Sequence, residues 1–134
     1  MTKISEVESI GPTFAAKLQE AGIETVEGLL KAGGAAAGRK DLATRTGIDI
    51  KKLLEWVNRA DLARIKGVGS EYADLLETAG VDSVKELGTR KADNLHAKLT
   101  ELNAAKSLVR RTPALAEVEK WVAEAKTLEQ AVTH

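Results

Sequence analysis

Glycine turns beside basic side chains are the feature of this sequence most able to do chemistry. Two turns stand directly before helical stretches, Ser9-Ile10-Gly11-Pro12 and Lys66-Gly67-Val68-Gly69. Because glycine has no side chain, the backbone N–H groups of such turns could approach a phosphate at the positive end of a helix. The pattern predicts contact with a polyanion at Gly11, Lys66, Gly67 and Gly69.

A third turn, Gly47-Ile48-Asp49, precedes a helix whose first residues include Lys51 and Lys52. Lysine ammonium groups and exposed N–H groups at a helix start could hold the same phosphate. The alternative is a solvated helix face on which these lysines pair with Glu55. Basic residues that we expect to contact a polyanion lie around Gly47 and in the second half of the chain. They are Arg39, Lys40, Arg45, Lys51, Lys52, Lys106, Arg110 and Arg111.

Catalytic and metal chemistry is not expected. The two imidazoles, His96 and His134, stand far apart in the sequence, and there is no cysteine. The pair Gly33-Gly34 is not followed by the Gly-Lys-Thr ending of a nucleotide-binding loop. We therefore expect no enzyme activity, no metal site and no cofactor.

An internal repeat must position these residues. The stretch from Val7 matches the stretch from Ile65 at a constant offset of 58 positions, without a gap. Later the register slips by seven residues, and Trp56 returns as Trp121. The identical pairs are Gly11 and Gly69, Ala15 and Ala73, Leu18 and Leu76, Ala21 and Ala79, Gly22 and Gly80, Val26 and Val84, and Leu29 and Leu87.

Each copy has the spacing of helices joined by short turns. After the first turn of each copy, apolar residues recur at three- and four-residue steps and predict one buried stripe per helix. Gly22 and Gly80 stand where a left-handed helix end belongs, and Thr25 and Ser83 are predicted N-caps. In each copy the tryptophan is predicted to fill the core. The residues of the two predicted stripes are Phe14, Ala15, Leu18 and Ala21, and Tyr72, Ala73, Leu76 and Ala79.

The repeat predicts two units, residues 1–60 and 61–134. Neither glycine nor proline interrupts residues 50–65, so we expect a helix to join the units into one rigid body, with Asp61 able to cap a new start. In the second unit, the last turn, residues 108–113, has lost its glycine. Pro113 is predicted to stand in the first turn of the final helix.

The residues Ile10-Gly11-Pro12, Ala15 and Leu18, and Gly67-Val68-Gly69, Ala73 and Leu76, resemble the helix-hairpin-helix superfamily of DNA ligases, repair nucleases and Holliday-junction proteins. The segment Ala21-Gly22-Ile23 with Thr25-Val26 and Leu29-Leu30, followed by Gly47 and Lys51-Lys52, also looks like the C-terminal domain of the RNA polymerase alpha subunit.

As a full-length arrangement, the chain resembles the bacterial domain-of-unknown-function family 4332. The resemblance implies an all-α fold of two tandem helix-hairpin-helix units, about four hairpins with the last degenerate, in one compact body. The resemblance to the helix-hairpin-helix superfamily also implies contact with DNA without sequence readout. The superfamily places Lys or Arg after the second glycine, whereas this chain has Pro12 and Thr13 in one copy and Ser70 and Glu71 in the other.

Charge decides where a polyanion could bind. Twenty basic and twenty acidic residues give a net charge of zero, so no global field attracts DNA. The balance is −3 for residues 1–30, +4 for 31–60, −3 for 61–87 and +2 for 88–134. Each copy therefore has an acidic leading hairpin and a basic trailing one.

Two functions remain open. The first is a non-catalytic module that binds the DNA backbone, duplex or junction, without sequence specificity. The alternative is a protein-protein interaction or self-association module, in which the acidic half of one molecule docks on the basic half of another. No apolar run is long enough to span a bilayer, and the sequence begins without a signal pattern, so we expect a cytoplasmic protein with no membrane contact.

Overall fold

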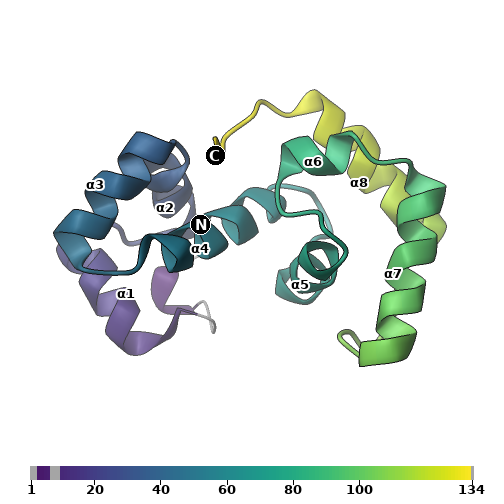
Figure 1. Cartoon of the computed structure of the whole chain (residues 1–134), viewed down its shortest axis with the longest axis horizontal. Coiled ribbons are helices and arrows are strands. Elements are labelled where there is room, and N and C mark those ends of the chain that lie inside the picture. The colour runs from purple at the N-terminus through teal and green to yellow at the C-terminus, as the bar shows by residue number, and fades with distance from the viewer. Residues whose placement is uncertain (1–2, 7–9, 134) are drawn as a thin grey trace. The chain divides into compact units, whose positions relative to one another are not determined.

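The computed structural model describes residues 3–6 and 10–133, without the side chains of Glu6 and Ser70. Within these residues the chain forms eight α-helices and one 3-10 turn, and its only β-type pairing is an isolated bridge between Lys3 and Thr25 (Figure 1). The predicted all-α class is confirmed. The predictions for Val7, Ser9 and His134 lie outside the described residues.

The chain divides into two compact units. Unit 1 comprises Met1–Ala60 with Ala131–His134, and unit 2 comprises Asp61–Gln130. The expected second unit extended to residue 134, whereas residues 131–133 group with unit 1 in the structure. The reason is that Val132 is buried in the core of unit 1, where the N–H of Thr133 donates to the carbonyl oxygen of Gly34 (2.9 Å).

Unit 1 is built from short helices around one apolar core. Its elements are the 3-10 turn η1 (Ile4–Glu6) and the helices α1 (Gly11–Glu20), α2 (Val26–Gly33), α3 (Ala36–Thr46) and α4 (Ile50–Leu62). The first helix, α1, packs against η1 and α3, and α2 packs against α3. The largest fully buried side chains of this unit are Ile4, Leu18, Leu29, Leu42, Leu53 and Val57.

The predicted helix ends are confirmed in both copies. The N–H of Gly22 donates to the carbonyl of Gln19 (2.9 Å), and Gly22 takes a φ of +87°, which a side chain would strain. Gly80 repeats this geometry with a φ of +92°. The hydroxyl of Thr25 accepts from the N–H of Gly28, and that of Ser83 from the N–H of Glu86, so both cap the helices that follow.

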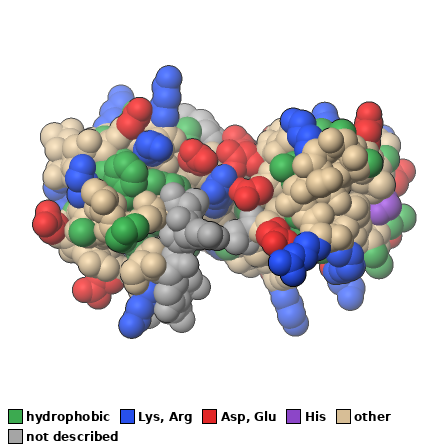
Figure 2. Space-filling view, turned by 90° about the horizontal axis from the view of Figure 1, so that it is seen from below, with side chains coloured by type: hydrophobic (Ala, Val, Ile, Leu, Met, Phe, Trp, Pro, Cys, Tyr) green, Lys and Arg blue, Asp and Glu red, His purple; other side chains and the backbone are tan. Residues whose placement is uncertain are grey.

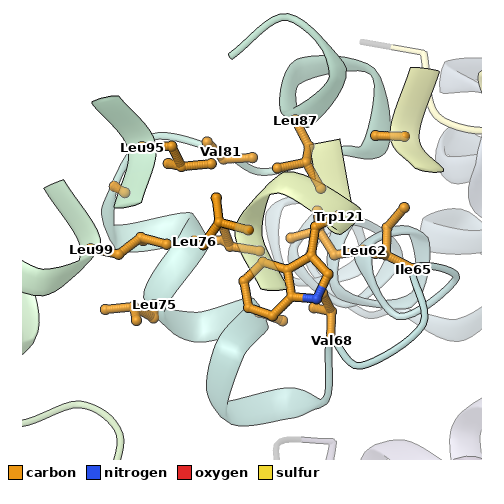
Figure 3. Close-up of a cluster of buried hydrophobic side chains, with 14 of the residues drawn as sticks. Leu62, Ile65, Val68, Leu75, Leu76, Val81, Leu87, Leu95, Leu99 and Trp121 are labelled. Atoms are coloured by element: carbon orange, nitrogen blue, oxygen red, sulfur yellow. The ribbon is translucent and has the colours of Figure 1, made fainter. Parts of the chain in front are cut away.

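Unit 2 has the same order of elements. After the end of α4 come α5 (Ser70–Thr78), α6 (Val84–Gly88), α7 (Ala92–Lys106) and α8 (Leu115–Thr127). The last helix packs against α6 and α7, and α5 packs against α7 (Figure 1). In the core of this unit, Trp121 lies among Leu62, Val68 and Leu76 (Figure 3). Both Trp56 and Trp121 are buried, as predicted.

The predicted joining helix is present, because α4 continues two residues past Ala60 into unit 2. Asp61 does not start a new helix there. Its buried carboxylate accepts from the N–H of Val84 (2.8 Å) and pairs with Arg64 (2.8 Å). It therefore holds the start of α6 through an interaction between residues far apart in the sequence.

Side chains organise the last turn of unit 2, residues 107–114, in place of a glycine. Ser107 takes a φ of +49°, and the amide of Asn103 accepts from the N–H of Val109 (2.9 Å) and donates to Thr112 (3.1 Å). Pro113 was predicted to stand in the first turn of α8, and this was wrong. The helix begins at Leu115 with Ala114 as its N-cap, so Pro113 lies two positions before the first helical residue.

Within the described part of the chain, every helix is too short or too polar to span a bilayer.

Candidate functional site

The most distinctive surface feature of unit 1 is an aromatic ring with a lysine on each of two helices. Phe14, in α1, packs its ring against Trp56 with 5.3 Å between the ring centroids. The ammonium group of Lys17 lies 5.7 Å from the centroid of Phe14, and that of Lys52, from α4, lies 5.6 Å from it. Both distances are within the reach of a cation–π attraction. We call Phe14, Lys17 and Lys52 the Phe14 face.

The Phe14 face holds two positive charges beside one partly exposed ring. Phe14 is half-buried, while Lys17 and Lys52 are exposed. Because the ring rests on buried Trp56, its position is set by the core, and the ring in turn limits where the two ammonium groups lie. The face therefore gathers two positive charges around one ring.

Of the two lysines in the Phe14 face, only one was predicted as a site residue. Lys52 was a predicted site residue, whereas Lys17 was not, because it stands in a stretch dominated by glutamate. Its spacing of three residues from Phe14 places both on one side of a helix and was the available signal. The approach of Lys52 to the same ring is a contact between two helices, and the spacing of residues along the sequence does not predict it.

Unit 2 keeps the aromatic pair but not the charges. Tyr72 packs on Trp121 with 5.2 Å between ring centroids, and its hydroxyl donates to the carbonyl oxygen of Arg111 (3.0 Å). At the offset of 58, the position of Lys17 is occupied by Leu75, which is buried. At the offset that relates the tryptophans, the position of Lys52 is occupied by Glu117. The repeat thus loses both cations in its second copy.

Three of the four predicted turn glycines have a conformation that needs glycine. The φ angles are +75° at Gly11, +72° at Gly47 and +90° at Gly67. A side chain at Gly67 would also lie 3.3 Å from the indole nitrogen of Trp121. Gly69 differs, because its φ is −90° and a Cβ there would meet no atom within 4 Å.

Carboxylates occupy backbone donors at two of the predicted turns. The N–H of Lys51 donates to Asp49 (2.9 Å), and the N–H of Lys66 donates to Glu124 (3.1 Å). Of the backbone donors predicted to hold a phosphate with Lys51 and Lys52, the N–H of Lys51 is therefore already bound by the neighbouring aspartate. At the start of α1, by contrast, no side chain of the described residues caps the helix, and no acidic residue stands in the first turn.

Arg39, predicted among the basic residues that contact a polyanion, is a buried residue. Arg39 is only 4% exposed, and its guanidinium donates to the carbonyl oxygens of Gly33 (3.0 Å), Gly34 (2.7 Å) and Thr133. Burial lowers its pKa from the ordinary value. Its donors are used to hold backbone together inside unit 1.

The other predicted cations are all exposed, and two of them, Arg45 and Arg111, form ion pairs with carboxylates. Arg45 pairs with Asp41 (3.0 Å). Arg111 pairs with Glu117 through two hydrogen bonds (2.8 and 3.2 Å), which raise the pKa of Arg111 and lower that of Glu117. The exposed residues on separate elements are Lys40 in α3, Lys51 in α4, Lys106 in α7 and Arg110 in the last turn of unit 2.

The described side chains include no group of three or more histidine, cysteine, aspartate or glutamate residues that could hold a metal. Basic and acidic side chains are interspersed on the face drawn in Figure 2.

Comparison with known proteins places the chain in a family. No curated protein and no solved structure matches it. One family model, described as a domain of unknown function (DUF4332), matches residues 8–128 and so spans both units. The chain therefore belongs to the DUF4332 family.

Proposed function

We propose that this chain is a non-catalytic, cytoplasmic module of two tandem helix-hairpin-helix units, and that unit 1 binds the DNA backbone without sequence specificity. The observation that carries the proposal is the Phe14 face, where α1 and α4 bring two lysines to one ring. Lysine ammonium groups bind phosphate as point charges and release counterions when they do so.

The start of α1 supports the same surface. Gly11 opens the helix, Ile10 at the N-cap position makes no side-chain cap, and Phe14 follows within the first turns. The partial positive charge of a helix start favours an anion near the lysines. Backbone phosphates carry no base identity, so this mode of binding predicts little dependence on DNA sequence.

Unit 2 contributes less to this proposal. Leu75 and Glu117 replace the two lysines, and Glu124 binds the N–H of Lys66 at the glycine turn. A carboxylate at that position repels a phosphate. We therefore assign the DNA contact to unit 1, with Lys51 and Lys40 as additional exposed cations.

Charge reversal tests the Phe14 face. The double variant K17E/K52E should weaken binding to a fluorescein-labelled duplex about tenfold or more at low salt, because each change removes an attraction and adds a repulsion. The matched control is K3E/K31E, which alters two other exposed lysines of unit 1 by the same formal charge. Fluorescence anisotropy measures both. Equal losses would mean diffuse attraction and would contradict a localised site.

A second function is favoured by the carboxylates of Asp49 and Glu124. Because each binds a backbone donor that a phosphate would need, the fold could have kept its hairpins and lost its nucleic-acid role. It would then bind a protein partner through alternating acidic and basic surfaces. Light scattering at low and high salt distinguishes the two functions: salt-sensitive oligomers together with no DNA binding at low salt would favour the interaction module.

A further inference from the structure

Residues 131–133, which we call the docked segment, follow α8 in the chain but belong to unit 1. The N–H of Thr133 donates to the carbonyl oxygen of Gly34 (2.9 Å), and the hydroxyl of Thr133 accepts from the N–H of Ala36 (3.3 Å). Its carbonyl oxygen accepts from Arg39. Every one of these polar groups of Thr133 is therefore bound by the segment between α2 and α3 or by α3 itself.

The docked segment also packs closely against unit 1. Val132 is only 2% exposed and belongs to the core of unit 1. A Cβ on Gly34 would overlap the carbonyl oxygen of Ala131, so a side chain at residue 34 would block the close approach of the two backbones. The present occupant places the side chain of Val132 in the core and follows it with the hydroxyl of Thr133.

All of these contacts join the docked segment to residues of unit 1 alone, although the segment follows unit 2 in the chain. Only residues 128–130 separate it from the end of α8 at Thr127. The same segment from another molecule would make the same contacts, with the additional entropic cost of association, which a higher protein concentration offsets.

We propose that unit 1 accepts the docked segment of a second copy of the chain, so that two molecules exchange residues 131–133 and form a dimer. Each unit 1 core is then completed by Val132 of the other molecule. Exchange is slow, because Val132 must leave a core and the guanidinium of Arg39 must release a carbonyl before a new segment binds.

A disulfide trap tests the exchange, since the natural chain has no cysteine. In the full-length double variant A36C/T133C, the two cysteines replace residues whose N–H and hydroxyl are in contact. Tagged and untagged chains are mixed, incubated at about 10 µM and about 1 mM, since dimerisation follows mass action, and then oxidised with oxidised glutathione. Covalent dimers that contain both chains should increase about tenfold with concentration. The single variant T133C measures random cross-linking.

Light scattering on chains without cysteine gives an independent readout. The natural chain and T133S, which keeps the hydroxyl, should both dimerise at the higher concentration. V132D should remain monomeric, because its carboxylate cannot enter the core. If the trap yields only internal disulfides at both concentrations, and the natural chain stays monomeric, the segment docks only within its own chain and the proposal is wrong.

Discussion

Arg39 and Lys40 are adjacent in the sequence and carry the same charge, but they have different roles in the structure. Arg39 is buried with three carbonyl partners, whereas Lys40 is exposed on α3. The sequence does not separate them, because the burial of Arg39 depends on Thr133, a partner 94 positions away. A local sequence pattern shows which side chains are charged, but tertiary contacts determine whether a charged side chain is buried or exposed to solvent.

Arg39 should therefore contribute to stability and not to DNA binding. R39M leaves carbonyl oxygens of Gly33, Gly34 and Thr133 without their donor, and we expect the free energy of unfolding to fall by about 2–4 kcal/mol. K40M should change it by less than about 0.5 kcal/mol. Urea denaturation followed by circular dichroism measures both. A stable R39M chain with weakened DNA binding would show that Arg39 faces the ligand.

At the scale of elements, much of the fold could be predicted from local signals. Thr25, Ser83, Gly22 and Gly80 end or begin helices where the sequence indicated, because capping depends on residues within one turn. The last turn of unit 2 could not be predicted in this way. There a network centred on Asn103 replaces glycine, and it depends on the contacts of one side chain with Val109 and Thr112.

The two glycines of the turn after α4 should respond differently to substitution. G67A should lower the free energy of unfolding by about 1–2 kcal/mol, because its φ of +90° strains any side chain. The added methyl group also crowds Trp121. G69A should be nearly neutral, because its φ is negative and a Cβ there has free space. Thermal or urea unfolding compares the two variants. Equal destabilisation would contradict the turn geometry.

At the scale of the whole molecule, the repeat predicted the change of unit at Asp61 but not the return of residues 131–133 to unit 1. Internal similarity identifies which segments are copies of each other. It contains no information about a segment outside the repeat, and the docking of Val132 follows from a tertiary contact.

Cutting the chain between Ala60 and Asp61 should leave unit 1 poorly folded. The fragment 1–60 lacks Val132, whose burial contributes about 1.5–3 kcal/mol, and it lacks the carbonyl that binds Arg39. The fragment 61–134 should also have low stability, since a core of this size is near the lower limit. Helicity and melting of each fragment measure this. Sharp melting of both fragments with full helicity would show that each unit folds independently of the other.

In the proposed function, Lys17 and Lys52 of unit 1 neutralise DNA phosphates. This can be measured as the dependence of duplex affinity on salt for the natural chain and for K17M/K52M. A footprint of about three to five phosphates predicts a slope of log affinity against log salt of roughly −3 to −4.5, and losing two contacts should reduce its magnitude by about 1.8. The control K3M/K31M should keep the natural slope. An unchanged slope in K17M/K52M, or no binding at low salt, would contradict the account.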